Sequence, residues 1–160
     1  MSIYIFSRPV NSGKTTELLQ WSSKQQNIYG ILMPDINGSR KIFDLHTKKI
    51  FDIECNGAVN EDEPITVVGR FSFYTAVFEK ANQIISDALK QNPHWLVIDE
   101  AGKLEIDGKG LYPSIINAVA FNKNNPGNLL VTVRESLLAE VVAYFNLKEY
   151  KLVHQLDDIL

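Results

Sequence analysis

The sequence of 160 residues has little of several residue types, and each shortage excludes a class of protein. A single cysteine, Cys55, leaves no disulfide framework and no cysteine cluster for a metal, so we expect it to be a small core or strand residue. No apolar run is long enough to span a membrane. The net charge of −3 gives no basic footprint, so nucleic acid is not an expected partner.

Length and composition are those of an ordinary globular protein. The hydrophobic fraction is 45% and the charged fraction is 22%. A chain of this length fits one domain, residues 1–160, with a sizeable core. Because the N-terminus enters a strand pattern at once, we expect no signal peptide and a reducing, cytoplasmic location. The sequence does not indicate a protein partner.

Residues 3–16, IYIFSRPVNSGKTT, have the pattern of a phosphate-binding loop. An apolar strand leads into a turn-prone loop, and a helical pattern begins at Lys14. Such a loop curls backbone N–H groups around an anion, and the helix N-terminus adds partial positive charge. In this pattern the Lys14 ammonium reaches the β- and γ-phosphates, and the Thr15 hydroxyl is a ligand of Mg²⁺. The residues predicted to bind the substrate phosphates are Pro9, Val10, Asn11, Ser12, Gly13, Lys14, Thr15 and Thr16.

The loop departs from the usual pattern at two positions. Arg8 stands where the pattern begins with glycine, and Asn11 stands where such loops often carry another glycine. Asparagine tolerates positive φ well, so Asn11 suits its place, whereas the consequence of Arg8 stays open. The alternative is a turn that carries a lysine by chance, but it leaves unexplained the apolar helical spacing of Leu18, Leu19 and Trp21.

The rest of the chain alternates strand and helix patterns. Apolar runs predict strands at residues 28–33, 95–98, 129–133 and 150–153, and helical spacing predicts helices over residues 14–26, 74–91, 111–121 and 137–145. Asn37-Gly38 is a hairpin signal, and alternating runs follow at residues 41–45, 49–53 and 67–71. We therefore predict an α/β fold with a mostly parallel central sheet, helices on both faces, and an antiparallel hairpin extension over about residues 28–72.

Two adjacent carboxylates, Asp99 and Glu100, follow the apolar strand at residues 95–98. This places them at the carboxyl edge of the sheet, where ligands bind in open α/β folds and where the phosphate loop emerges. Asp99 is predicted to hold Mg²⁺, with Thr15 as the other protein ligand. Glu100 is predicted to orient or deprotonate the water that attacks the γ-phosphate. The alternative is a solvated Asp-Glu turn that closes the strand.

Three segments together resemble one family: SRPVNSGKTT at residues 7–16, VVGRFSFY at 67–74 and VIDEAGKLE at 97–105. They are similar to the thermophile-type nucleoside-triphosphatases, a family of P-loop NTPases that includes the human cancer-related nucleoside-triphosphatase. The similarity extends from residue 3 to about residue 145, and Ala101 departs from it where a larger aliphatic residue is common. The resemblance implies a three-layer P-loop fold. It also implies Mg²⁺-dependent hydrolysis of nucleoside 5′-triphosphates, ATP and GTP among them, to diphosphate and phosphate, with low base selectivity.

Few arginines are available to neutralise charge during phosphoryl transfer, although one such contact can raise the rate by roughly 10³–10⁵. Arg70 matches the family's Gly-Arg-aromatic segment, and Arg134 follows an apolar strand toward the ligand edge. Both are candidate catalytic residues beside Lys14 and Glu100, and a structural ion pair is the alternative for each. Lys103 either contacts phosphate or Glu100 or forms a surface ion pair. Arg40 is expected to be a solvated charge on the hairpin.

Two other functions are compatible with the same loop. A nucleotide or small-metabolite kinase excludes water, usually with an arginine-bearing lid, and the chain has no basic lid pattern. Glu100 beside Asp99 also favours water as the acceptor. A nucleotide-dependent switch with low intrinsic hydrolysis stays open. No pattern identifies a base pocket, and the aromatic side chains at residues 71–74 are expected in the core.

Overall fold

The computed structural model describes residues 2–54, 62–68 and 71–159. Its strands are β1 (Ser2–Arg8), β2 (Ile28–Leu32), β3 (Asp35–Ile36), β4 (Ser39–Asp44), β5 (Ile50–Asp52), β6 (Ile65–Val68), β7 (Phe71–Tyr74), β8 (Trp95–Ala101), β9 (Asn128–Arg134) and β10 (Lys151–Val153). Its α-helices are α1 (Lys14–Ser22), α2 (Thr75–Leu89), α3 (Lys103–Ile106), α4 (Tyr112–Asn124) and α5 (Leu138–Tyr144). Short 3₁₀ turns lie at Glu135–Leu137 and Leu156–Asp158.

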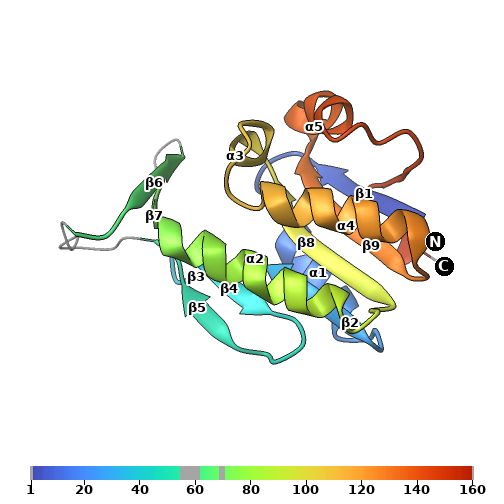
Figure 1. The fold of residues 1–160 in the computed structure, drawn as a ribbon, viewed down its shortest axis with the longest axis horizontal. Helices are drawn as coiled ribbons and strands as arrows, with labels where there is room; N and C mark the ends of the chain where they lie inside the picture. The colour runs from blue at the N-terminus through green and yellow to red at the C-terminus, as the bar shows by residue number, and fades with distance from the viewer. Residues whose placement is uncertain (1, 55–61, 69–70, 160) are drawn as a thin grey trace.

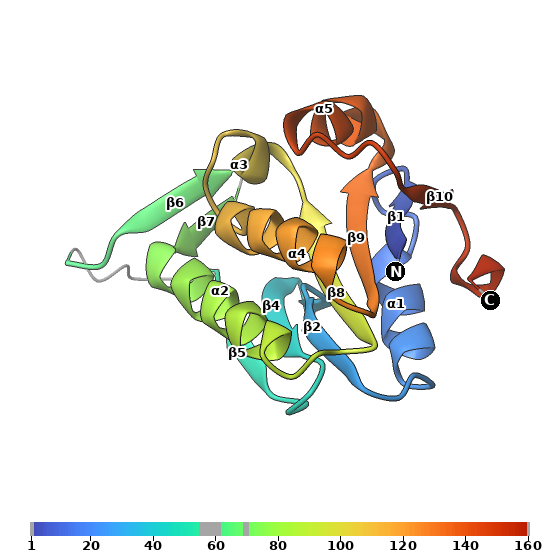
Figure 2. The ribbon, with the colours of Figure 1, turned by 45° about the vertical axis from the view of Figure 1, so that its right-hand side comes forward.

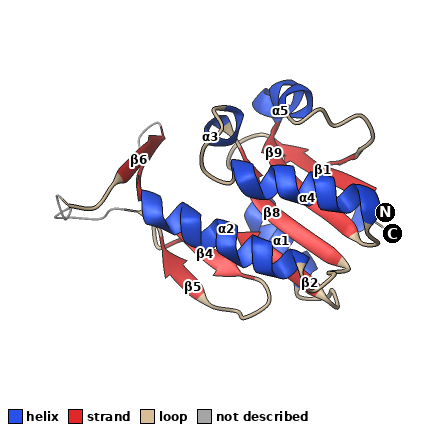
Figure 3. Cartoon of the chain, viewed as in Figure 1, coloured by secondary structure: helices blue, strands red, loops and turns tan. Residues whose placement is uncertain are grey.

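A mixed sheet forms the centre of the molecule (Figures 1 and 3). Within the described residues it has eight strands in the order β10-β1-β9-β8-β2-β4-β3, with β5 paired to β4. The strands from β10 to β2 run parallel, and β4, β3 and β5 add an antiparallel edge. Both β1 and β8 lie beside β9, so the phosphate loop after β1 and the acids of β8 emerge at the same edge of the sheet.

Helices cover both faces of the sheet. Successive residues of a strand point to opposite faces, and apolar residues on each face pack against helices. In β1, Ile5 belongs to the core packed against α2, α4 and α5, whereas Tyr4 and Phe6 belong to the core packed against α1. Figure 2 shows α2 and α4 on one side of the strands and α1 on the other. The predicted α/β architecture is therefore confirmed. In the described parts of the chain, no helix has the length and apolar character needed to cross a bilayer.

The predicted hairpin extension over residues 28–72 is only partly correct. β3, β4 and β5 do form the antiparallel edge, and the Asn37-Gly38 turn joins β3 to β4. However, β2 pairs in parallel with β8 and belongs to the central sheet, because Ile31 and Leu32 are buried, one in each core. β6 and β7 form a separate two-stranded sheet within the described residues. Cys55 lies outside those residues.

Some element boundaries also differ from the predictions. α1 ends at Ser22 rather than near residue 26, and β8 continues through the acid pair to Ala101. The short helix α3 was not predicted. It follows Gly102, whose N–H donates to a carboxylate oxygen of Glu105 at 2.9 Å. This contact closes a helical turn that apolar periodicity does not reveal.

Candidate functional site

The loop between β1 and α1 has the backbone conformation that the sequence predicted. Asn11 has a φ of 56°, in the left-handed region where asparagine is tolerated. Gly13 has a φ of 81° and is the N-cap residue of α1, which has no side-chain cap. The first N–H groups of the helix therefore lack a side-chain acceptor from the cap, as is typical of an anion-binding helix start.

Lys14, the first residue of α1, is buried, with an exposed fraction of 8%. Its ammonium donates to the backbone carbonyls of Arg8 at 3.2 Å and Pro9 at 3.0 Å. Burial lowers the pKa of this amine, and the nearby carboxylates of Glu100 and Asp99 act in the opposite direction. The loop thus holds a desolvated cation beside the acid pair of β8.

Asp99 is the most fully engaged side chain of the site and is only 2% exposed. Its Oδ2 accepts from the Thr15 hydroxyl at 3.0 Å and from the Met33 N–H at 3.1 Å. Its Oδ1 accepts from the Thr132 hydroxyl at 2.5 Å. Three separate segments, the first turn of α1, β9 and the residue after β2, therefore donate to one carboxylate of β8, which fixes its orientation.

Glu100, the next residue of β8, pairs with Arg134, the last residue of β9. The Arg134 Nε donates to a Glu100 oxygen at 2.9 Å, and both side chains are partly exposed. Burial raises the pKa of Glu100, the Asp99 charge adds to this, and Arg134 and Lys14 oppose it. Arg134, which was predicted to follow an apolar strand toward the ligand edge, therefore lies at the site. It forms an ion pair with Glu100, the predicted water-activating residue.

A cavity of about 570 Å³ lies over the phosphate loop. It is lined by Val10, Asn11, Ser12, Gly13, Lys14, Thr15, Thr16, Leu19, Pro34, Asp35, Ile36, Arg40, Phe43, Ile50, Glu100 and Arg134. Of the predicted phosphate-binding residues, only Pro9 does not line it, and Pro9 contributes its carbonyl to Lys14. The Ser12 Oγ is buried and has no hydrogen-bond partner among the described residues.

A second, smaller cavity of about 100 Å³ adjoins the first. The two cavities share Arg40, Glu100 and Arg134 as lining residues. Most other walls of the smaller cavity are apolar and include Phe73, Phe78 and Leu137. The Glu100–Arg134 pair therefore lies at the boundary between a polar loop cavity and an apolar chamber.

The remaining predicted cations lie in different settings. Arg8 does not line either of these cavities: its guanidinium pairs with Glu17 at 2.6 Å and lies over the Phe6 ring. Arg40 is not the solvated charge that the sequence predicted, because it is partly buried and donates to the Met33 carbonyl at 3.1 Å. Arg70 lies outside the described residues.

The oxygen donors of Thr15 and Asp99 are of the kind that Mg²⁺ prefers. Across residues 2–54, 62–68 and 71–159, no group of three or more Asp, Glu, His or Cys side chains is arranged to hold a metal ion. A cation held by Thr15 and Asp99 would therefore take its remaining ligands from water and substrate phosphates, which is the usual arrangement for Mg²⁺. The residues present fit that ion.

Sequence reasoning missed Thr132, whereas it gave Glu105 a structural rather than a catalytic role. Thr132 is fully buried and is a polar residue inside the apolar run of β9, a signal that could have identified it. Glu105 accepts the N–H groups of Gly102 and Leu111, both at 2.9 Å, and orders the segment that follows the acid pair. The contacts of Glu105 depend on how the segments before and after α3 come together, which the sequence pattern does not show.

The fold and the loop geometry define a P-loop α/β protein, and two solved structures share this fold. One is the crystal structure of THEP1 from the hyperthermophile Aquifex aeolicus, which is similar to this chain with a TM-score of 0.67 and a sequence identity of 19%. The matched region covers 99% of this chain and 92% of the THEP1 chain. The other is the solution structure of a human cancer-related nucleoside triphosphatase, which is similar to this chain with a TM-score of 0.63 and a sequence identity of 20%. The matched region covers 94% of this chain and 86% of the human chain. No protein-family model and no curated protein matches the sequence. At these identities the likeness establishes the fold.

Proposed function

We propose that this protein is a Mg²⁺-dependent nucleoside-triphosphatase of the family that it resembles. It hydrolyses ATP, GTP and related nucleoside 5′-triphosphates to diphosphate and phosphate, with low base selectivity. The observation that carries the proposal is the convergence of Lys14, Thr15, Asp99 and Glu100 at one sheet edge, where Thr15 donates to Asp99 at 3.0 Å. The fold shared with a human nucleoside triphosphatase supports it.

The phosphate loop supplies charge and hydrogen bonds to the substrate. Lys14 exchanges its two carbonyl partners for the β- and γ-phosphate oxygens, where its charge neutralises that of the substrate. The exchange is favourable because a charge-assisted hydrogen bond is stronger than one to a neutral carbonyl. Thr15 and Asp99 would hold Mg²⁺, which supplies charge neutralisation when it is bound. The fixed contacts of Asp99 keep its carboxylate oriented before substrate arrives.

Glu100 prepares the nucleophile. Its carboxylate orients a water molecule and takes one of its protons as the water oxygen bonds to the γ-phosphorus. The bond from the γ-phosphorus to the bridging oxygen breaks, the nucleoside diphosphate leaves with that bond's electron pair, and the γ-phosphoryl group is released as inorganic phosphate. A carboxylate whose pKa is raised by burial is a better proton acceptor near neutral pH. Arg134 is the second cation at this point, and we infer that it turns from Glu100 to the phosphate during the reaction.

Water is favoured over a larger phosphoryl acceptor by the carboxylate at this edge of the sheet. Glu100, which pairs with Arg134 at 2.9 Å, lines the loop cavity and is placed to orient a water molecule. The sequence also has no basic lid pattern of the kind that a kinase uses to hold a second substrate. This supports hydrolysis rather than transfer to a second nucleotide.

A phosphate-release assay tests the proposal. We expect release from ATP, GTP, CTP and UTP at rates within about tenfold of one another, and only when Mg²⁺ is present. Transfer to added nucleoside monophosphates, followed with labelled γ-phosphate, should be absent. Transfer that exceeds release would identify a kinase. Binding without release, accelerated by a protein partner, would identify a nucleotide-dependent switch.

A further inference from the structure

Three exposed apolar side chains line the phosphate-loop cavity: Val10, Leu19 and Ile50. They are 51%, 42% and 53% exposed, and they are three of the nine exposed large hydrophobic residues among those described. Single exposed apolar residues are ordinary, but a group of them at the mouth of a concave polar site indicates a ligand with an apolar part.

The apolar side chains lie on two opposed elements. Leu19 follows Thr15 and Thr16 by four and three residues on α1, so it shares the helix face that carries these loop residues. Phe43 of β4 and Ile50 of β5 are direct partners in the antiparallel register. Phe43 packs against the core on the α1 side of the sheet.

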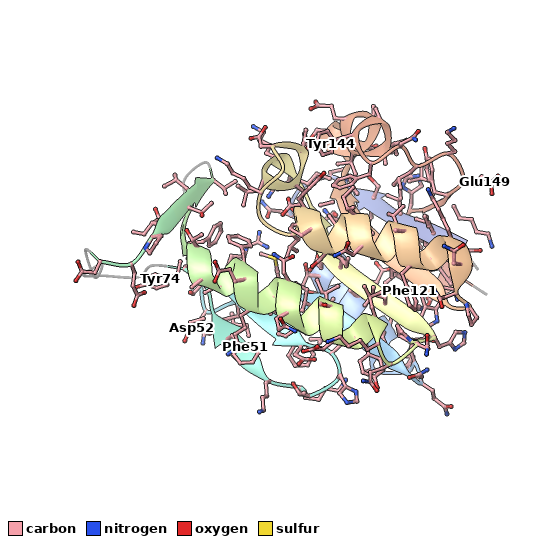
Figure 4. All side chains as sticks on the ribbon, in the orientation of Figure 1. Phe51, Asp52, Tyr74, Phe121, Tyr144 and Glu149 are labelled. Atoms are coloured by element: carbon pink, nitrogen blue, oxygen red, sulfur yellow. The ribbon has the colours of Figure 1, made fainter. Side chains whose placement is uncertain are left out.

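The alternation of side chains along β5 gives Ile50 the same orientation as Phe43, toward the α1 side of the sheet. Its neighbour Phe51, labelled in Figure 4, packs against the core on the α2 side, and the Lys80 ammonium of α2 lies 3.7 Å from its ring centroid. Because adjacent strand residues point to opposite faces, Ile50 points to the α1 side, as Phe43 does. Leu19 on the helix and the Phe43–Ile50 pair on the hairpin therefore form two walls of one cavity.

We propose that these walls hold the nucleobase of the substrate, with purine and pyrimidine rings packing between Leu19 and the Phe43–Ile50 pair. The inference rests on the proposed function and extends it to the recognition of the base. The cavity of about 570 Å³ is within the range of small-molecule sites, and its other lining residues include the whole run from Asn11 to Thr16. A flat base with an apolar face, joined to a triphosphate, matches both parts.

The chemistry of these walls explains low base selectivity. Leu19, Phe43 and Ile50 have no hydrogen-bonding groups in their side chains, so they contact the faces of a ring and not its edges. Every base has such a face, whereas discrimination between bases requires hydrogen bonds to their edges. The apolar walls therefore add affinity for all four nucleoside triphosphates without choosing among them.

Calorimetric titration in the presence of Mg²⁺ tests this site, with ATP, CTP and inorganic tripolyphosphate as ligands. Tripolyphosphate has the phosphates and lacks the base and ribose. The variants are Leu19→Ala and Ile50→Ser, and the control is Ile116→Ser on α4, where the residue is 39% exposed and outside the cavity. All four proteins should have the same far-ultraviolet circular dichroism spectrum, because the substituted side chains are exposed.

We expect each cavity variant to weaken ATP and CTP binding about tenfold and to leave tripolyphosphate binding within twofold of wild type. The control should match wild type for every ligand. Unchanged ATP and CTP binding in both variants, or an equal loss for tripolyphosphate, would overturn the base site and leave the proposed function intact. If wild type binds neither nucleotide, both the base site and the proposed function are wrong.

Discussion

The strand-end region and the hairpin region contribute to the same cavity in opposite ways. In the strand-end region, Lys14, Asp99 and Glu100 are each held by named hydrogen bonds to the loop or to neighbouring strands. In the hairpin region, β3 to β5, the walls of the cavity include the apolar side chains Phe43 and Ile50. The difference indicates that the proposed phosphate chemistry uses fixed charges, whereas the proposed base site uses apolar surface.

The largest effect should come from Glu100, the residue of the strand-end region that we propose activates water. Glu100→Gln keeps the shape of the side chain and removes its ability to accept a proton, so kcat should fall by about 10²–10⁴ while KM changes little. Steady-state phosphate release measures both constants. The exposed Glu140→Gln is the matched control. A wild-type kcat in Glu100→Gln would contradict the proposed role of Glu100. It would also remove the expected difference in catalytic effect between the strand-end region and the hairpin region.

The next effect concerns the buried cation. Lys14→Ala removes the charge that we propose contacts the triphosphate, so affinity for Mg²⁺-nucleotide should fall by about 30-fold or more. Calorimetry measures the dissociation constant, with Lys123→Ala on the exposed side of α4 as the control. The loss should be equally large for tripolyphosphate, unlike that of the apolar variants. A loss confined to nucleotides would place Lys14 at the base.

A pair of threonines compares the two regions in terms of stability. Thr132 is buried and donates to Asp99, whereas Thr47 lies in the exposed turn between β4 and β5 and donates to Asp44 at 2.7 Å. Thr132→Val should lower the free energy of unfolding by about 1–3 kcal/mol, because it leaves a buried carboxylate oxygen without a donor. Thr47→Val should cost less than about 1 kcal/mol, because Thr47 is exposed and Asp44 keeps the N–H groups of His46 and Thr47 as donors. Urea unfolding of both variants decides the comparison, and equal losses would contradict it.

The smallest effect is the pH dependence of stability contributed by Glu105. Burial raises the pKa of this carboxyl above its ordinary value, and the N–H groups of Leu111 and Gly102 oppose the shift. The folded state therefore binds a proton more tightly than the unfolded state, so stability is greatest below the ordinary glutamate pKa. It falls as pH rises from that value through the higher pKa of the folded state.

Glu105→Gln removes this titration, so the fall in unfolding free energy above the ordinary glutamate pKa should become shallower than in wild type. Urea unfolding from pH 4 to pH 8 measures it, and the exposed Glu140→Gln should keep the wild-type slope. An unchanged slope in Glu105→Gln would show that Glu105 does not titrate differently in the folded and unfolded states.

The sequence predicted the parts of this molecule that depend on local pattern. The phosphate loop, the apolar strands beside it and the helices α2 and α4 all follow from hydrophobic periodicity and from the GKT tripeptide, residues 13–15. The position of Asp99 beside Thr15 followed from the rule that parallel strands end at one edge.

The features that the sequence did not predict depend on contacts between distant segments. β2 has the same apolar pattern whether it pairs in parallel or antiparallel, so only its partner β8 decides its place in the sheet. Arg8 occupies a loop position in the motif, but Glu17 and the Phe6 ring hold its guanidinium beside β1 and α1. The separation of β6 and β7 from the main sheet likewise depends on tertiary pairing.

The most direct test of the whole account is a calorimetric titration of ATP into wild type and Asp99→Asn, each with and without Mg²⁺. If the loop amine and the acid pair enclose one magnesium-bound triphosphate, wild type binds one equivalent and Mg²⁺ tightens the binding. Asp99→Asn should lose most of that tightening. Binding by wild type that is indifferent to Mg²⁺, or no heat of binding at all, would contradict the account.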